Sequence, residues 1–334
     1  MRVSSLRGAE RGGVAVIVAV LAVPLFALGA YALDLGNLWQ TRRHLVTATD
    51  AAALAAAQTY AVGDNGCGGV DDAFVAANFS AATVQACTPS AGAAGGDSSG
   101  YVTVDALTTV RFTFAGVLGH DDSDVRSATT AMYGIPSAYT GLRPLGLCLD
   151  ASPELAAWLN LPDGPDGSSG TVRITYSKEH PDACGSDVPG NWGVLDFDGG
   201  ANSNADTRAW LRDGYPGEVS VGQIVDGDTG AFSTSLNSAL QYLLDTGLVF
   251  GLPVFDTATG NGSNARFHVA AVVAVKIVGF RTTGSQADRY IDLQFQQAVL
   301  QGSCCTQGPD TGVRAVRICA VDPTFDVNDC LPEG

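Results

Sequence analysis

The chain has 334 residues, of which 46% are apolar, so it is long enough to bury a sizeable core and is neither a disulfide miniprotein nor a wholly disordered chain. Its 18 Lys and Arg against 34 Asp and Glu give a net charge of −16, and a chain that repels phosphate is a poor candidate for binding nucleic acid. The charge is unevenly distributed, because residues 1–43 hold five arginines against Glu10 and Asp34, a net of +3, while the remainder carries −19. A slightly basic head and a strongly acidic body indicate two environments.

The first predicted element is a membrane-spanning helix. Residues 14–33 read VAVIVAVLAVPLFALGAYAL, twenty residues without a charge, and a helix of that length spans about 30 Å. A core helix of a soluble protein seldom runs so far without a polar face, and Pro24 is tolerated in a membrane helix as a kink. Arginines precede the span and Asp34 follows it, so the positive-inside rule predicts a cytoplasmic N-terminus and an extracytoplasmic body.

A cleaved signal peptide is the alternative interpretation of this segment. Ala30-Tyr31-Ala32 satisfies the small-x-small rule, and cleavage after Ala32 would release a body that begins at Leu33. The apolar run is longer than a usual signal core, which favours the anchor.

Residues 35–62 predict that the helix continues outward without a break. They are rich in Ala and contain no Pro and, after Gly36, no Gly. Mostly small apolar residues recur along one face, at Leu38, Leu45, Ala52 and Ala56. This stripe is suited to close packing, either against another helix or against the protein's own domain.

Several short motifs stand in order along this helix. A basic residue and a Gly at Arg11-Gly12 precede the apolar run, and Asp34-Leu35-Gly36, Arg42-Arg43 and the alanine run from Asp50 to Ala57 follow it. In this order the motifs resemble the N-terminal signature of TadE/TadG-like Flp (tight-adherence) pilus-assembly proteins. The resemblance implies a structural or assembly role at the membrane, with other pilus or assembly proteins as partners through the N-terminal helix.

Further elements are predicted up to residue 136. Asp71 to Ala81 is expected to form a short helix, Tyr101 to Phe114 alternates as a half-buried strand pair, and Val125 to Tyr133 is expected to add a third strand. Gly134 to Ser137 marks a domain boundary.

The second half predicts a strand-dominated domain. Its expected helices are Pro153 to Leu159, Ala205 to Asp213 and Phe232 to Leu244. Its expected strands are Leu145 to Leu149, Thr171 to Ser177, Gly193 to Phe197, Leu248 to Phe255, Phe267 to Phe280, Tyr290 to Leu300 and Val313 to Val321. The strand from Phe267 is apolar on both faces, so we expect it in the centre of a sheet.

The predicted fold class is therefore α+β. An N-terminal single transmembrane helix extends into a long Ala-rich helix and is followed by strand-dominated extracytoplasmic domains with a few short helices. The expected division is a cytoplasmic head (1–13), the span (14–33), a TadE- or pilin-like helix with a small sheet (34–136) and a disulfide-stapled α+β domain (137–334).

All eight cysteines lie on the predicted outer side, where an even number indicates disulfides. Spacing favours Cys67 with Cys87 and Cys148 with Cys184, whereas Cys304, Cys305, Cys319 and Cys330 allow three pairings among themselves. A zinc site would need a Cys-x-x-Cys pair or nearby histidines, and the sequence has neither.

Two acidic motifs are the candidates for a metal site. Asp150 and Ser152 begin an Asp-x-Ser-x-Glu sequence, which differs at its last position from the Asp-x-Ser-x-Ser of a von Willebrand A domain, and Ser152 before Pro153 is explained as a helix cap. Asp196 and Asp198 lie in a Gly-rich turn that fails the EF-hand pattern. Turn geometry is the simpler explanation for both, so no metal is predicted.

No catalytic residues and no cofactor are predicted, because the chain has neither a Gly-x-Ser-x-Gly elbow nor a His-Glu-x-x-His helix. The function expected is therefore a non-enzymatic, membrane-anchored component of a Flp/Tad-type pilus or a related surface apparatus. The alternatives are a cell-surface adhesion module with a divalent cation near Asp150 or Asp196, and a secreted enzyme of unrecognised type.

Overall fold

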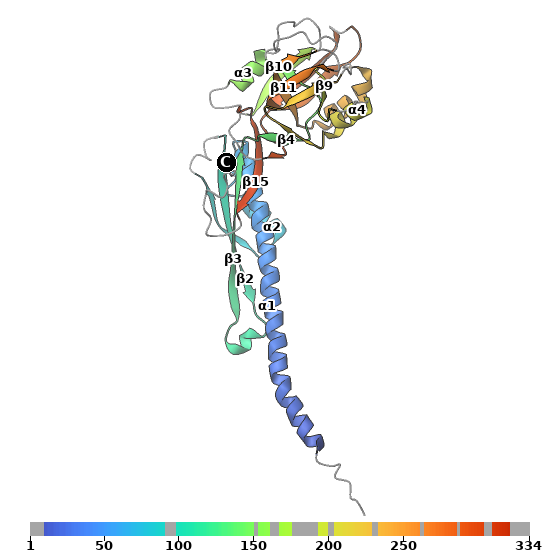
Figure 1. Cartoon of the computed structure of the whole chain (residues 1–334). Coiled ribbons are helices and arrows are strands. Elements are labelled where there is room, and N and C mark those ends of the chain that lie inside the picture. The colour runs from blue at the N-terminus through green and yellow to red at the C-terminus, as the bar shows by residue number, and fades with distance from the viewer. Residues whose placement is uncertain are drawn as a thin grey trace, which may run out of the picture.

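The computed structural model is an α+β fold built on one very long helix, which confirms the predicted class (Figure 1). The structure describes residues 10–90, 98–149, 153–160, 167–175, 193–199, 204–228, 233–260, 264–285, 288–303 and 309–320.

Helix α1 (Glu10–Ala61) runs without a break through Pro24 and beyond the apolar segment, as predicted. It ends where Gly63 adopts a φ of 82°, a left-handed conformation that suits Gly and stops the helix. In Figure 1 the N-terminal part of α1 extends away from the body, whereas its C-terminal part lies along a sheet.

The sheet beside α1 has five strands in the order β1-β2-β3-β15-β13. Its strands are β1 (Thr83–Pro89), β2 (Gly100–Arg111), β3 (Asp122–Gly134), β15 (Val313–Ala320) and β13 (Ala298–Val299). Only the β13–β15 pair is parallel among these pairings. Two strands from the C-terminal half, β15 and β13, thus complete a sheet that the N-terminal half begins. The predicted domain boundary near residue 136 stays a prediction.

The apolar stripe of α1 packs on this sheet. Leu45, Ala52 and Ala56 are fully buried together with Val102 and Val104 of β2. The small side chains let the helix backbone approach the strands closely. Of the two partners considered for the stripe, the protein's own sheet is the one that covers it.

The predicted strand pair from Tyr101 to Phe114 is wrong, because the segment forms one 12-residue strand, β2. Buried and more exposed residues alternate from Val102 to Val110 without an interruption, and no Gly, Pro or Asn supplies a turn. Its hairpin partner is β3, and the short 3-10 helix η2 (Ala115–Leu118) forms the tip between them.

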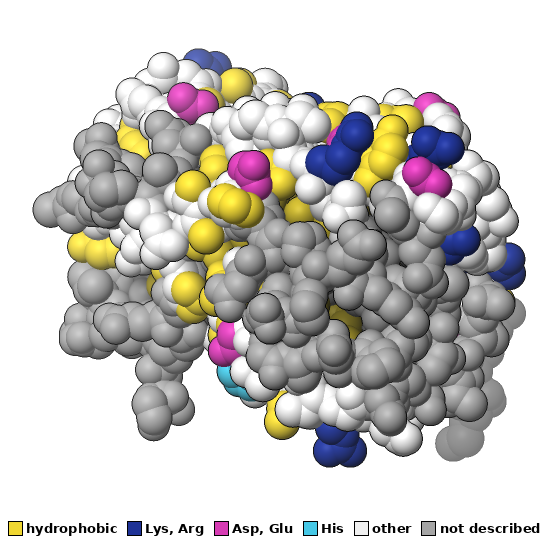
Figure 2. Space-filling model, turned by 90° about the horizontal axis from the view of Figure 1, so that it is seen from above, with side chains coloured by type: hydrophobic (Ala, Val, Ile, Leu, Met, Phe, Trp, Pro, Cys, Tyr) yellow, Lys and Arg dark blue, Asp and Glu magenta, His cyan; other side chains and the backbone are white. Residues whose placement is uncertain are grey.

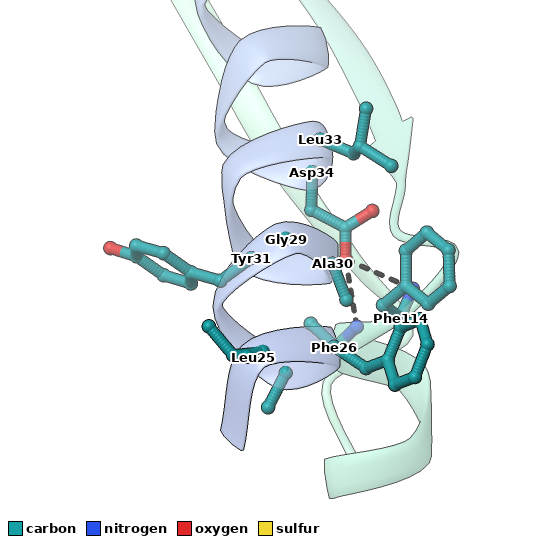
Figure 3. Close-up of a pocket in the computed structure, with 10 residues that line it drawn as sticks. Leu25, Phe26, Gly29, Ala30, Tyr31, Leu33, Asp34 and Phe114 are labelled. Atoms are coloured by element: carbon teal, nitrogen blue, oxygen red, sulfur yellow. Dashed lines mark hydrogen bonds between the residues drawn. The ribbon is translucent and has the colours of Figure 1, made fainter. Parts of the chain in front are cut away.

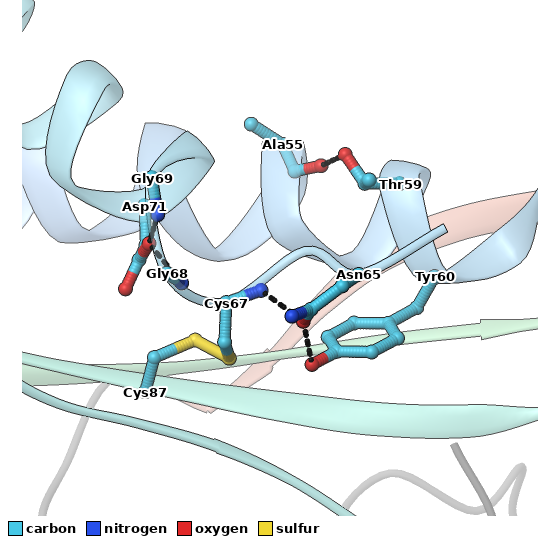
Figure 4. Close-up of a disulfide and its surroundings, with 9 residues drawn as sticks. All are labelled: Ala55, Thr59, Tyr60, Asn65, Cys67, Gly68, Gly69, Asp71 and Cys87. Carbon is cyan, nitrogen blue, oxygen red and sulfur yellow. Dashed lines mark hydrogen bonds between the residues drawn. A yellow bond between two sulfur atoms is a disulfide. The ribbon is translucent and has the colours of Figure 1, made fainter. Parts of the chain in front are cut away.

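A disulfide ties the end of α1 to the sheet (Figure 4). Cys67, in the loop before α2 (Val70–Asn78), bonds to Cys87 of β1. The side-chain oxygen of Asn65 accepts hydrogen bonds from the Tyr60 hydroxyl at 2.8 Å and from the Cys67 N–H at 3.0 Å. Cys148 and Cys319 are also disulfide-bonded, and none of the described cysteines is free. The other predicted disulfide candidates lie outside the described residues: Cys184, Cys304, Cys305 and Cys330.

The body formed by the C-terminal half of the chain is built on a seven-stranded sheet with the central order β5-β10-β11-β12-β6. The strands are β5 (Leu147–Cys148), β6 (Ser168–Thr175), β7 (Leu195–Asp196), β9 (Ile224–Gly227), β10 (Phe250–Thr259), β11 (Arg266–Arg281) and β12 (Tyr290–Gln296). Val273 and Val275 of β11 pack in one core, and Val272 and Ala274 pack in another. The prediction of a central strand buried on both faces is confirmed.

Smaller elements surround this sheet. The helices are α3 (Pro153–Leu159), α4 (Asn204–Asp213), η4 (Thr234–Leu236) and α5 (Asn237–Thr246). A three-stranded sheet is formed by β14 (Gly302–Ser303), β4 (Ala138–Thr140) and β8 (Glu218–Ser220). The outer end of the body carries separate positive and negative side chains with apolar ones between them (Figure 2), and no patch of one charge gathers on the described part of that face.

Candidate functional site

The first functional feature is the uncovered apolar part of α1. Within the described residues, α1 is long and apolar enough to cross a membrane, and its most apolar stretch is not buried at all. Val20 is 65% exposed and Phe26 is 79% exposed. Side chains of this kind are normally buried in a water-soluble fold, so their exposure marks an interaction surface.

The second feature lies where this apolar stretch ends, at Asp34 (Figure 3). The Asp34 side chain is buried, and its two carboxylate oxygens accept three backbone hydrogen bonds from the tip between β2 and β3. The donors are the N–H groups of Thr113 at 2.9 Å, Phe114 at 2.9 Å and Ala115 at 2.8 Å. One carboxylate thus holds the hairpin tip against the helix.

These contacts also set the ionisation of Asp34. Burial acts to raise the pKa of the carboxyl group, but the three N–H donors outweigh it and hold the pKa below its ordinary value. The carboxylate therefore stays charged at neutral pH.

We predict a pH-dependent attachment of the tip from this lowered pKa. A carboxylate whose folded pKa is depressed contributes its full stabilisation above the unfolded pKa of about 3.9 and loses it as the pH falls through the folded value. At pH 7, D34N is expected to speed amide hydrogen exchange at Phe114 and Ala115 relative to the wild type. The difference should begin to shrink as the pH falls below about 3.9 and should vanish only below the lowered folded pKa, where both chains carry a neutral side chain. A difference that stays constant down to pH 2 would contradict a role of the charge.

A groove of about 710 Å³ opens between the hairpin tip and α1. Its walls come from the stretch of α1 between Leu25 and Asp34, including Phe26 and Ala30, and from Phe114 and Ala115 of the tip. Figure 3 places Phe114 beside Phe26 and Ala30. The walls are almost entirely apolar, so the groove suits an apolar occupant.

Aromatic and basic side chains follow on the next turns of α1. Trp39 is 62% exposed, and the guanidinium carbon of Arg43 lies 4.8 Å from the centre of its ring. Trp39, Arg42 and Arg43 line one shallow depression on the helix surface. An amphipathic aromatic ring with cations beside it is typical of the boundary between lipid and water.

A comparison with protein families finds a match that falls on this helix. Residues 12–59 match the family model described as "Putative Flp pilus-assembly TadE/G-like". This segment is TadE/G-like. The match confirms the resemblance seen in the sequence and supports a role in Flp pilus assembly. Comparisons with curated proteins and with solved structures found no match.

The TadE/G-like segment coincides with α1, and its motifs have structural roles in this chain. Asp34 holds the hairpin tip, and the alanine run buries Ala52, Ala53, Ala56 and Ala57 against the sheet. Asp50 accepts a hydrogen bond of 2.8 Å from the Thr129 hydroxyl of β3. The segment therefore combines an uncovered apolar half with a half that is fixed to the body.

The predicted metal candidates lie outside the TadE/G-like segment. Asp196 is buried, and its Oδ1 accepts the N–H groups of Asp198 at 3.2 Å and Gly199 at 3.1 Å, which is the geometry of a side-chain-stabilised turn. Burial is the main cause that raises the pKa of Asp196, and the side-chain hydrogen bond with Asp198 raises it further. The described residues contain no group of three or more His, Cys, Asp or Glu side chains arranged to hold a metal ion. Asp150 and Ser152 lie outside the described residues.

His268 pairs with a carboxylate on the neighbouring strand. Its Nδ1 lies 2.7 Å from Oδ1 of Asp256, and both side chains are more than a third exposed. The pair joins β11 to β10 at a register shift, where Asp256 lies between the paired residues Phe255 and Thr257 of β10. It is a cross-strand contact at the surface of the sheet.

The hairpin tip is the functional element that sequence reasoning missed. Its signal was present, because residues 112–119 read FTFAGVLG without a charge, whereas Arg111 precedes them and Asp121 and Asp122 follow. An apolar turn between charged strand ends departs from the polar composition expected of an exposed hairpin loop.

Proposed function

We propose that this protein is a membrane-anchored structural component of a Flp-type pilus-assembly apparatus. Residues 14–33 anchor it, the N-terminus lies in the cytoplasm and the acidic, disulfide-bonded body lies outside. The observation that carries the proposal is the uncovered apolar half of α1 within the TadE/G-like segment. No catalytic step is assigned to the protein.

The continuity of α1 supports a mechanical role. The helix passes from the apolar stretch into the sheet-bound stretch without a break, so it joins the membrane to the body as one stiff element. Other pilus or assembly proteins are the proposed partners through the lipid-facing half, since the stripe at Leu45 and Ala52 is already covered by the chain's own sheet.

The structure of Asp34 favours an uncleaved anchor over a signal peptide. Cleavage after Ala32 would leave Asp34 as the second residue of the mature chain, at a free and fraying end. The three hydrogen bonds from the hairpin tip would then depend on a helix end without a preceding turn. The adhesion module and the secreted enzyme remain hypotheses without a supporting site among the described residues.

We predict that a charge in the middle of the span removes the protein from the membrane. Leu21 is 54% exposed in the apolar stretch, and an Arg at the centre of a membrane helix costs roughly 3 kcal/mol on the insertion scale. L21R is therefore expected to lower the fraction of the protein that resists alkaline extraction from membranes and to abolish complementation of a deletion strain that lacks pili. L248R is the matched control, because Leu248 is 41% exposed but lies in the outer body.

Two further measurements complete this test. An alkaline phosphatase fused to the C-terminus should be active, since the enzyme folds only outside the cytoplasm. N-terminal sequencing of the cell-associated protein should find no chain that begins at Leu33. A soluble mature protein starting there would overturn the anchor.

A further inference from the structure

The hairpin tip reaches past Asp34 toward the N-terminal, apolar side of α1. Phe114 and Ala115 share a groove with Phe26 and Ala30 of the helix (Figure 3). At 1.5 Å per residue, Ala30 lies about 6 Å and Phe26 about 12 Å below Asp34 along the axis. If residues 14–33 cross the membrane, the tip stands at the depth of the outer leaflet rather than above it.

The composition of the tip fits that depth. Residues 112–119 carry no charge, and the charges of the hairpin begin at Arg111 on one strand and at Asp121 on the other. The Phe114 side chain is 42% exposed, and the facing Phe26 is 79% exposed. Exposure of these apolar surfaces to water would destabilise the fold, whereas contact with lipid removes that penalty.

The backbone of the tip is also prepared for an environment without water. The Phe112 N–H bonds to the Asp121 carbonyl, and the N–H groups of Thr113, Phe114 and Ala115 bond to the Asp34 carboxylate. Two further donors, Gly119 and His120, bond to carbonyl groups of the 3-10 turn. An unpartnered N–H group costs several kcal/mol in hydrocarbon but little in water, so this degree of pairing distinguishes a lipid-facing turn from a solvated loop.

We propose that the β2–β3 hairpin tip inserts into the outer leaflet as a second membrane contact, and that phospholipid acyl chains fill the groove between the tip and α1. Asp34 is the positioning residue, because its carboxylate holds the turn against the helix at that depth. Trp39 and Arg43 then lie above the tip, at the level of the lipid headgroups. This proposal rests on the proposed anchor. It adds the depth of the hairpin tip in the membrane, acyl chains as the ligand of the groove, and a reason for the three hydrogen bonds to Asp34.

Acyl chains are the occupant that the surroundings favour. The groove is continuous with the uncovered side chains of residues 25–33, so whatever solvates the span also has access to the groove. A second copy of this chain or a helix of another protein would instead exclude lipid from the same surface.

The test places a tryptophan at three positions of the full-length chain in a W39F background, whose remaining tryptophans are a common reference. F114W reports on the tip and L21W on the span, while Y242W reports on an outer-body position that is 40% exposed. Each protein is reconstituted into phosphatidylcholine vesicles whose acyl chains are brominated near the carbonyl end or near the methyl end. Emission is also measured with aqueous iodide.

Loss of F114W emission with bromine near the carbonyl end, together with protection from iodide, is the expected result. D34N added to F114W should reduce the bromine quenching and increase the iodide quenching, because the tip is no longer held at its depth. L21W should be quenched by bromine near the methyl end, and Y242W by iodide alone.

Three outcomes would overturn the proposal. Quenching of F114W by iodide alone, with L21W still quenched by bromine, would place the tip outside the membrane while leaving the proposed anchor intact. Protection of F114W from both quenchers would show that protein covers the tip. Failure of brominated lipid to quench L21W would remove the anchor itself, and the leaflet insertion with it.

Discussion

Asparagine in place of Asp310 is expected to lower the free energy of unfolding by about 3 kcal/mol. Arg314 in β15 is only 2% exposed, and its two terminal nitrogens donate to the two oxygens of Asp310 at 2.7 and 2.9 Å. The neutral amide leaves a buried guanidinium without its counter-charge while keeping an acceptor for the Gly312 N–H, which bonds to Asp310 Oδ1 at 3.0 Å. The loss is at the lower end of the range for buried pairs, because the Asp310 side chain is 25% exposed.

The chain offers a matched control for this effect. Arg173 and Asp292 form the same two-bond arrangement, at 2.7 and 2.8 Å, but the Arg173 side chain is 56% exposed. D292N is expected to cost about 1 kcal/mol or less, because water solvates the arginine that remains. Chemical denaturation of both variants in the same detergent measures the two losses. Equal losses would show that burial of the arginine does not determine the effect.

G66A is expected to destabilise the protein by about 2 to 3 kcal/mol through overpacking. A Cβ at this position would overlap the carbonyl oxygen of Ala56 and lie 2.8 Å from its carbonyl carbon and Cα. These are backbone atoms in the middle of a helical run and cannot rotate away. The loop cannot move aside easily either, since Asn65 is bonded to Tyr60 on one side of Gly66 and Cys67 is cross-linked to Cys87 on the other.

G36A is the control for this substitution. Gly36 lies inside α1, whereas Gly66 lies in the loop after it, and a Cβ at Gly36 meets nothing within 4 Å. Because Ala is the better helix former, this change should stabilise α1 by about 1 kcal/mol. Thermal unfolding followed by circular dichroism should therefore move the two midpoints in opposite directions. A lower midpoint for G36A as well would show that glycine flexibility in this region matters for reasons other than space.

The elements with a strong local signal were predictable from the sequence. An uncharged run followed by an Ala-rich stretch is enough to predict α1 as one continuous helix, and a segment of 14 residues with apolar residues on both faces places β11 inside a sheet. Both signals depend on composition and periodicity, which neighbouring residues determine. The exposed apolar half of α1 was predicted for the same reason.

Contacts between distant parts of the chain were not predictable in this way. Nothing near Asp34 indicates that its carboxylate binds backbone groups 79 to 81 residues later, because those groups are present in every residue. The unbroken alternation of β2 was mistaken for two strands, since no turn residue marks where such a segment would fold back. The pairing of β15 with β3 depends on how well two strands that lie far apart in the sequence fit together.

That pairing has a consequence for the order in which the protein is made. The helix and strands β1 to β3 are synthesised first, yet the edge of β3 is paired only when residues 313–320 arrive. Until then the N-terminal part presents an open strand edge, which is a site for wrong pairing with any other chain. The last strand therefore closes the first sheet, so correct assembly of the N-terminal part waits until almost the whole chain has been made.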